Sequence, residues 1–341
     1  MFEDLSPWTN AALFAAAALV VWFAGARLAS YADRIAEKTG LGRQLLGILL
    51  LGGVTSSPEM AVGATAALSG TPALSINDVL GSAAINLVIL AIADARYGRE
   101  ALTSTPSTPD VLLQGALGIV LLAIVVAAVT TGDRAVAGMG IWSWLLLASF
   151  IAAIWLISRS QGRRSWVPGQ RPAQEPRRDA DDDETPLRGL VLRTAVVAAA
   201  ILVAGFVLAS SGEALAESTG LGASFFGAVL LGLSTSLPEI STVLESVRLR
   251  RYDMALADIF GSNLFNVTII VGVDALYGGG PVLAEAGAFA AFGALLAIVL
   301  TAVYLVGIIE RHDRTVLRMG YDSLAVIALY AAGVAVLYQL R

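Results

Sequence analysis

Two five-residue segments place a carboxylate, hydroxyl groups and a proline inside long apolar stretches of the chain. The segments are Thr55-Ser56-Ser57-Pro58-Glu59 and Thr235-Ser236-Leu237-Pro238-Glu239, and their residue numbers differ by 180 (from 59 to 239). In each segment a threonine and a serine precede the glutamate by four and three positions, so the three side chains share one face of a helix. An ionised carboxylate at membrane depth is costly and usually marks an ion or proton pathway, so the two copies predict a cation site.

Polar pairs recur at the same offset in the next apolar stretch of each copy. Ser82 with Asn86, and Ser262 with Asn266, are spaced i and i+4 and therefore share a helix face. The motif prolines add freed backbone carbonyls, because proline has no N–H for the carbonyl four residues before it. Carboxylate, hydroxyl, amide and backbone oxygens, without histidine or thiolate, suit hard cations such as Na⁺ and Ca²⁺.

The agreement between the two copies extends well beyond these motifs. Asp78 recurs as Asp258 and Asp94 as Asp274, and the register holds without an insertion from about 28/208 to 98/278. The chain is therefore an internal duplication. We expect these four aspartates near the ends of membrane spans, where capping or interfacial roles compete with a role in ion entry.

The composition excludes an ordinary soluble protein. Of 341 residues, 57% are hydrophobic and 14% are charged, whereas about a quarter of the residues in soluble proteins are charged. The chain has no cysteine, which excludes disulfides and thiolate metal sites. The acidic start MFEDLSPWTN lacks a basic region, so no cleavable signal peptide is predicted. We interpret the chain as a polytopic membrane protein that has the lipid bilayer as its partner and binds no nucleic acid.

Hydropathy predicts an all-α membrane protein with ten transmembrane helices, five in each copy. The expected spans are residues 10–29, 42–68, 79–95, 111–131, 136–157, 190–209, 222–247, 255–276, 282–309 and 323–340. Pro58 and Pro238 would break the second and the seventh helix. We therefore divide the chain into a first five-helix repeat (1–158), a cytoplasmic polar linker (159–188) and a second five-helix repeat (189–341).

The basic residues predict the orientation in the membrane. With ten spans, both termini share one side with the loops after the even-numbered spans, and only Arg134 and Arg341 of all Lys and Arg residues fall on that side. The positive-inside rule makes the opposite side cytoplasmic, so both termini lie outside the cytoplasm, in what we expect to be a prokaryotic-type cell membrane. Because each copy has an odd number of spans, the copies cross in opposite directions. This inverted-repeat architecture is typical of many secondary transporters.

The linker contains an acidic run between several prolines. The run comprises Asp179, Asp181, Asp182, Asp183 and Glu184. A Ca²⁺-sensing role is one interpretation, but no glycine-punctuated calcium loop accompanies the run. We therefore favour a solvated, disordered connection.

The paired motifs resemble the α-repeats of the sodium/calcium exchanger family, within the calcium/cation antiporter superfamily. The family pattern is a Gly-Thr-Ser-x-Pro-Glu-like core, followed one helix later by Gly-Ser-x-x-x-Asn or Asp. Here the cores are residues 54–59 and 234–239, and the second elements are residues 81–86 and 261–266. The resemblance implies a central site with four cation positions, and sliding of the first and sixth spans as the gate.

The resemblance also implies which residues bind the ions. Glu59 and Glu239 match the Ca²⁺-binding carboxylates, with Na⁺ sharing or flanking that position. The positions that match further Na⁺ and Ca²⁺ ligands, together with the central polar pair of asparagines, are Thr55, Ser56, Ser82, Asn86, Thr235, Ser236, Ser262, Asn266, Gly52 and Gly232. No cofactor is implied beyond the transported ions Na⁺ and Ca²⁺.

Three departures from the family pattern bear on the site and on the coupling ion. The glycine that usually precedes the threonine is Val54 in one copy and Ser234 in the other. Potassium-dependent and some prokaryotic relatives carry aspartate at the position of Asn266. Proton-coupled relatives carry a glutamate near the positions of the two asparagines, and this chain lacks that glutamate. The resemblance therefore favours exchange of Na⁺ for Ca²⁺, with H⁺- or K⁺-coupled transport of Ca²⁺ or another divalent cation as the alternative.

The charge of the site independently favours exchange. With both glutamates ionised, the empty site is negative, and moving that charge through a closed intermediate is costly. One Ca²⁺ or several Na⁺ ions cancel the charge, so the loaded carrier can turn over and the empty one resists. A cation channel on the same repeat and a non-transporting membrane sensor are the rival hypotheses. No nucleophile–base arrangement supports an enzyme, and the oligomeric state stays open.

Overall fold

The computed structural model describes residues 2, 5–40, 46–97, 101–104, 109–160, 186–217, 232–310, 315–316 and 319–340. These residues are mainly helical, with two short β-hairpins. Eight helices are long and apolar enough to cross a membrane: α1 (Pro7–Thr39), α5 (Pro72–Tyr97), α6 (Pro109–Thr131), α7 (Ile141–Ser160), α8 (Leu187–Glu217), α12 (Tyr252–Leu276), α14 (Ala288–Glu310) and α15 (Tyr321–Leu340). The chain is therefore an integral multi-pass membrane protein.

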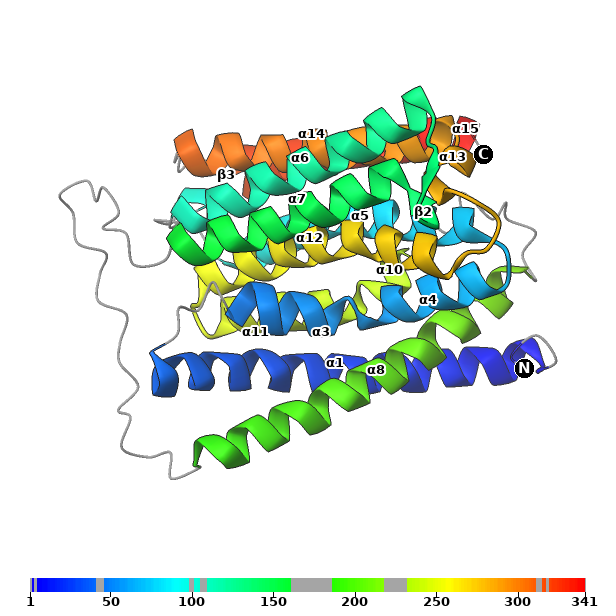
Figure 1. The fold of residues 1–341 in the computed structure, drawn as a ribbon. Coiled ribbons are helices and arrows are strands. Elements are labelled where there is room, and N and C mark those ends of the chain that lie inside the picture. Colours follow the sequence, from blue (N-terminus) through cyan, green and yellow to red (C-terminus); the bar gives the residue numbers. More distant parts are fainter. Residues whose placement is uncertain are drawn as a thin grey trace.

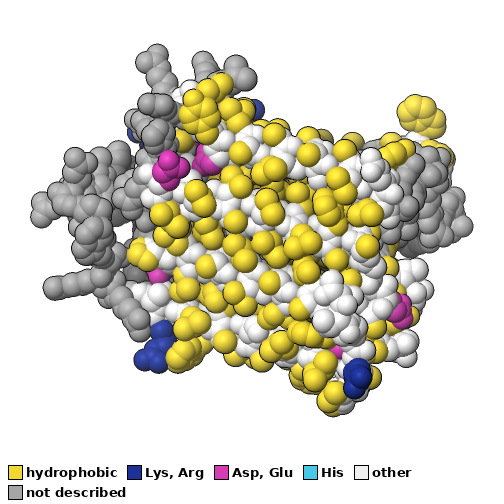
Figure 2. Space-filling view, turned by 90° about the horizontal axis from the view of Figure 1, so that it is seen from above, with side chains coloured by type: hydrophobic (Ala, Val, Ile, Leu, Met, Phe, Trp, Pro, Cys, Tyr) yellow, Lys and Arg dark blue, Asp and Glu magenta, His cyan; other side chains and the backbone are white. Residues whose placement is uncertain are grey.

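The outer surface of these helices is apolar, as a surface in contact with lipid must be. Exposed large side chains include Phe23 on α1, Ile151 on α7 and Leu202 on α8. Figure 2 shows that hydrophobic side chains cover the middle of one face, whereas charged side chains lie toward its two ends. The apolar belt has the position expected of a membrane-embedded surface.

The long helices form layers around a central pair (Figure 1). In α5 and α12, 89% and 83% of the most apolar stretch is buried, whereas less than a third is buried in α1, α7, α8 and α15. α1 and α8 pack along each other as an outer layer on one side, and α6, α7, α14 and α15 lie on the other side. The core therefore runs along α5 and α12, one helix from each copy.

Short helical segments that contain the two motifs lie between the α1/α8 layer and the central pair. In the first copy they are the π-helical turn η1 (Gly47–Gly52), α3 (Gly53–Thr55) and α4 (Ser57–Leu68), and in the second copy they are α10 (Gly232–Thr235) and α11 (Leu237–Arg248). The helices are interrupted at Ser56 (φ -74°, ψ 6°) and Ser236 (φ -81°, ψ 6°). Pro58 and Pro238 occupy the second position of the following helix, where the missing N–H is harmless because the first N–H groups have no intrahelical partner.

The predicted span 136–157 begins later in the structure. A hairpin of β1 (Ala135–Val136) and β2 (Met139–Gly140) comes first, and α7 starts only at Ile141. Ala137 (φ 50°) and Gly138 (φ 85°) form the turn, and their left-handed backbone cannot continue a right-handed helix.

The predicted span 282–309 also divides in two. A short helix, α13 (Val282–Glu285), precedes α14, because the backbone at Ala286 is extended (φ -73°, ψ 130°). The 3₁₀ turn η2 (Leu102–Ser104) occupies the corresponding place in the first copy. A second hairpin, β3 (Thr315–Val316) with β4 (Met319–Gly320), precedes α15 as the first hairpin precedes α7.

The predicted cytoplasmic linker lies largely outside the described residues. α7 ends at Ser160, and α8 begins at Leu187. The division into 1–158, 159–188 and 189–341 therefore stays a prediction, as does the role of the acidic run within the linker.

Candidate ion-binding site

The two motif glutamates lie at matching places in the fold. Glu59 and Glu239 occupy the first turn of α4 and α11, directly after the interruption, and both side chains are fully buried (0% exposed). The free N–H groups at a helix start carry a partial positive charge, which favours a carboxylate there. No hydrogen bond from the described residues reaches any of the four carboxylate oxygens. The glutamates therefore lack the partners that buried structural carboxylates have.

Hydroxyl pairs join the two copies beside these glutamates. Thr55 Oγ1 lies 3.1 Å from Ser262 Oγ, and Thr235 Oγ1 lies 3.2 Å from Ser82 Oγ. In each pair the threonine comes from the motif of one copy and the serine from the core helix of the other copy. All four side chains are fully buried. The two motifs therefore meet the opposite core helix in the same way.

Gly52 and Gly232 allow this close approach of motif and core helix. A Cβ atom on Gly52 would lie 2.8 Å from the backbone nitrogen of Ser262 on α12. A Cβ atom on Gly232 would lie 3.1 Å from the backbone nitrogen of Ser82 on α5. Each glycine carbonyl also accepts from the threonine hydroxyl three residues later, at 3.4 Å and 3.2 Å, respectively. A side chain at either position would push the motif away from the core helix.

The remaining predicted site residues are also buried, with one departure from the expected pairing. The Oγ atoms of Ser56 and Ser236, and both polar side-chain atoms of Asn266, have no hydrogen-bond partner in the described parts of the chain. Asn86 Nδ2 donates to Oδ1 of Asn263 at 2.9 Å instead of pairing with Asn266. Sequence reasoning missed Asn263, because it stands one residue after the motif serine and so on a different face of α12.

Asp78 and Asp258 lie beside the glutamates. Both are fully buried (0%), and Asp78 interacts electrostatically with Glu59 as Asp258 does with Glu239. Asp78 Oδ1 also accepts from Thr235 Oγ1 at 3.4 Å. Burial beside the glutamates favours a role near the ion site over an interfacial role for this pair. The signal was readable in the sequence, since each aspartate stands four residues before the motif serine and shares its helix face.

Asp94 and Asp274 lie near the C-terminal ends of the core helices α5 and α12 and accept hydrogen bonds there. Asp94 accepts from the backbone nitrogens of Leu102 at 2.6 Å and Gly320 at 2.7 Å. Asp274 accepts in the same way from the backbone nitrogens of Val282, the first residue of α13, at 2.8 Å and of Gly140, the last residue of β2, at 2.7 Å. Each carboxylate therefore ties a hairpin of the opposite copy to a core helix, and the capping alternative describes this pair.

The central arrangement suits a hard cation better than it suits structural hydrogen bonding. A buried polar group without a partner costs about 1–3 kcal/mol, and more when it is charged. Ca²⁺ binds carboxylate, hydroxyl and carbonyl oxygens, which are the groups gathered here. Among the described residues, no three His, Cys, Asp or Glu side chains lie close enough to hold a metal ion. A cation at this site would therefore need hydroxyl and carbonyl oxygens in addition to the carboxylates.

The comparison with known proteins covers almost the whole chain. A model of the sodium/calcium exchanger protein family matches residues 9–169 and 190–339. The chain belongs to the sodium/calcium exchanger family. The inner membrane protein YrbG of Escherichia coli is 27% identical over 273 residues, which cover 78% of this chain and 79% of YrbG. The sodium/calcium exchanger MaX1 of Methanosarcina acetivorans is 28% identical over 136 residues, which cover 39% of this chain and 38% of MaX1.

A solved exchanger has the same fold. The sodium-calcium exchanger NCX_Mj, soaked with Na⁺ and Sr²⁺, matches with a TM-score of 0.68 and 16% identity, over 97% of this chain and 99% of that chain. The family match confirms the resemblance drawn from the paired motifs. The sodium/calcium exchanger family consists of transporters rather than enzymes, and membership in it supports antiport.

Proposed function

We propose that the protein is a secondary active antiporter that exchanges Na⁺ for Ca²⁺ by alternating access at the central site. The observation that carries this proposal is the pair of fully buried glutamates whose oxygens accept no hydrogen bond from the described residues. A buried carboxylate in this condition is destabilising unless a cation or a proton reaches it. In a family of ion exchangers, a site that needs a cation is the expected centre of transport.

The proposed ligand set follows the pseudo-symmetry of the contacts. Glu59 and Glu239 supply the negative charge for Ca²⁺. Asn86, which donates to Asn263, and Asn266 contribute the central polar side chains. The hydroxyl and backbone oxygens that complete the Na⁺ and Ca²⁺ positions come from Thr55, Ser56, Ser82, Thr235, Ser236, Ser262, Gly52 and Gly232. Irregular oxygen coordination of this kind is well tolerated by Ca²⁺.

The proposal includes the arrangement in the membrane. If the interrupted segments 46–68 and 232–248 each span the bilayer, they bring the eight long helices to ten, in two inverted sets of five. The motif prolines then break the second and the seventh helix. Figure 1 supports an even number of spans, since it shows both termini at the same end of the bundle. The basic residues favour placing that end outside the cytoplasm.

The topology has a direct test, because the chain contains no native cysteine. Cysteines introduced by Ala180→Cys and by Gly70→Cys should be labelled from opposite sides of the membrane, with position 180 cytoplasmic. Membrane-impermeant thiol reagents applied to sealed vesicles of known orientation make this measurement. Labelling of both positions from the same side would remove the inverted arrangement from the proposal.

The transport proposal is tested by ion flux in sealed vesicles that contain the purified protein. The gradients of Na⁺, H⁺ and K⁺ are varied one at a time, and Ca²⁺ movement should depend on an opposing Na⁺ gradient. Equal transport driven by a pH gradient without Na⁺ would favour the proton-coupled alternative, and a requirement for K⁺ would favour the potassium-coupled one. Ca²⁺ flux without any counter-ion would indicate a channel. Binding of Ca²⁺ without flux would indicate a sensor.

A further inference from the structure

A buried polar stripe continues from the central site along only one of the two motif helices. On α11, Glu239 is followed at helical spacing by Thr242 and Ser246, and all three side chains are fully buried (0%). The residues at the same offset on α4 are Val62 and Ala66. The duplication therefore provides its own contrast, because one copy is polar where the other is apolar.

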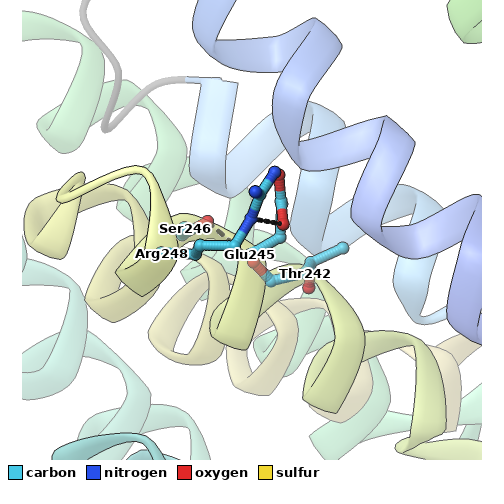
Figure 3. A network of polar contacts seen from close by, with 4 residues as sticks. All are labelled: Thr242, Glu245, Ser246 and Arg248. Carbon is cyan, nitrogen blue, oxygen red and sulfur yellow. Dashed lines mark hydrogen bonds and ion pairs between the residues drawn. The ribbon is translucent and has the colours of Figure 1, made fainter. Parts of the chain in front are cut away.

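Thr242 joins this stripe to the neighbouring core helix. Its Oγ1 atom donates to Oδ2 of Asp258 on α12, and it also lies 3.2 Å from the carbonyl oxygen of Glu239. Ser246 Oγ donates to the carbonyl oxygen of Thr242 at 2.8 Å (Figure 3). Polar atoms therefore connect the central glutamate with the last turn of α11.

The cluster around Thr242 has more oxygen acceptors than donors. A threonine hydroxyl has one hydrogen, so it cannot serve the Asp258 carboxylate and the Glu239 carbonyl at the same time. The second oxygen of Asp258, Oδ1, has no hydrogen-bond partner among the described residues although the residue is fully buried. Asp94 and Asp274, with comparable burial, have both oxygens bonded to backbone N–H groups. The cluster is therefore short of a hydrogen-bond donor, as the central glutamates are.

We propose that Asp258 and Thr242, with the carbonyl oxygen of Glu239, form an outer cation station between the central site and the membrane face at which α11 ends. The ligand class is a hard cation, Na⁺ or Ca²⁺, because the available ligands are a carboxylate, a hydroxyl and a carbonyl oxygen. The station serves one face of the membrane, since the equivalent positions in the first copy are the apolar Val62 and Ala66. It deepens the proposed exchange function and rests on it for the identity of the ions.

Two of the three arginines near the end of α11 are paired with carboxylates, and the third, Arg250, is exposed. Arg248 forms an ion pair with Glu245 at 2.6 Å (Figure 3), and Arg251 pairs with Asp33 and with Glu37, each at 2.9 Å. Pairing with carboxylates weakens the repulsion that these side chains exert on an approaching positive ion. The repulsion from Arg248 and Arg251 at this end of the stripe is therefore reduced.

Single cysteines test the path, because the chain has none of its own. The variants Thr242→Cys and Ser246→Cys, in the full-length protein in oriented vesicles, are treated with a small cationic thiol reagent from each side. Val62→Cys and Ala66→Cys are the matched controls from the first copy. We expect both second-copy variants to be labelled from the face at which α11 ends, and neither control to be labelled. Labelling of neither second-copy variant, or equal labelling of all four, would overturn the path.

Protection by ions tests the station itself and does not depend on transport. Na⁺ or Ca²⁺ should slow the labelling of the Ser246→Cys variant, which keeps all the proposed ligands, and the additional change Asp258→Asn should remove that protection. Protection that persists with Asp258→Asn would overturn the station. If the protein exchanged no Ca²⁺ while the Asp258-dependent protection were observed, the proposed function would fail and the station would stand.

A kinetic measurement separates a station from a merely structural cluster. Thr242→Val, which copies the residue of the first copy, should raise the half-saturating Ca²⁺ concentration about tenfold at the face at which α11 ends. The half-saturating concentration at the opposite face should stay unchanged. An equal change at both faces would assign Thr242 to folding or to the central site and contradict a one-sided station.

Discussion

Buried carboxylates occupy two regions of this protein, and their hydrogen-bond partners differ. At the ends of the core helices, Asp94 and Asp274 each accept one backbone N–H group on each oxygen. In the middle of the fold, the oxygens of Glu59 and Glu239 accept none from the described residues. The extent of burial is nearly the same in both regions, at 0–1% exposure. Burial alone therefore does not mark an ion site, whereas a buried carboxylate without donors does.

The difference arises from where each carboxylate stands along the chain. Asp94 and Asp274 face the starts of short helical turns and the ends of hairpins, where backbone N–H groups are free. The glutamates stand directly after a helix interruption and lie beside hydroxyl groups: Thr235 is close to Glu59, and Thr55 and Ser262 are close to Glu239. Hydroxyls can turn their hydrogens elsewhere and offer oxygen to a cation, whereas backbone N–H groups cannot.

The largest expected effect comes from neutralising one central glutamate. Glu59→Gln keeps the size of the side chain but removes its charge, so the remaining carboxylate cannot neutralise a divalent ion. Ca²⁺ exchange should fall about 100-fold or more, as expected for the loss of one buried charge partner. Glu239→Gln should behave in the same way, because the two glutamates occupy equivalent positions. The measurement is Na⁺-driven Ca²⁺ flux in vesicles, normalised to the amount of folded protein.

An intermediate effect, on stability rather than on transport, is expected at the helix ends. Asp94→Asn turns one acceptor oxygen into an N–H₂ group that faces a backbone N–H, so one buried hydrogen bond is lost. The free energy of unfolding should fall by about 1–3 kcal/mol, while the flux per folded molecule is retained. Thermal unfolding of the purified protein measures the first quantity, and vesicle flux measures the second. Collapse of transport at unchanged stability would place Asp94 in the ion path and end the distinction between the two regions.

The smallest expected effect concerns the hydroxyl pair that Thr55 and Ser262 form. Thr55→Val and Ser262→Ala each remove one oxygen while leaving both glutamates in place, so Na⁺ affinity should fall only a few-fold. A double-mutant cycle on the half-saturating Na⁺ concentration should give a coupling of about 0.5–1.5 kcal/mol, because the two hydroxyls contact each other. Strictly additive effects would show that the two oxygens do not act on the same ion.

The position of the central site could be predicted from the sequence, and the reason is the duplication. Glu59 and Glu239 occur in identical register inside apolar stretches, and the polar residues one helix later share their offset. Helical periodicity then places Thr55 and Ser56 on the same side as Glu59 without knowledge of the tertiary structure. Family membership confirmed the resemblance that these motifs indicated.

Other features depend on how the two copies pack, and local sequence does not encode them. The link between Asp94 and Gly320 joins residues 226 positions apart, and the pairing of Asn86 with Asn263 joins residues 177 apart. The hairpin before α7 follows from a left-handed backbone at Ala137, a conformation that alanine rarely adopts. Hydropathy, which averages over many residues, read that hairpin as the start of a span.

The most direct test of the central claim is Ca²⁺ binding to the purified protein, compared between the two regions. A ligand that binds only the folded state stabilises it by about 2.7 kcal/mol at a hundredfold excess over its dissociation constant. Ca²⁺ should therefore raise the melting temperature of the unaltered protein and of the Asp94→Asn variant, and should raise that of the Glu59→Gln and Glu239→Gln variants much less. Ca²⁺ stabilisation of undiminished size in either glutamine variant, or its loss with Asp94→Asn, would contradict a binding site at Glu59 and Glu239.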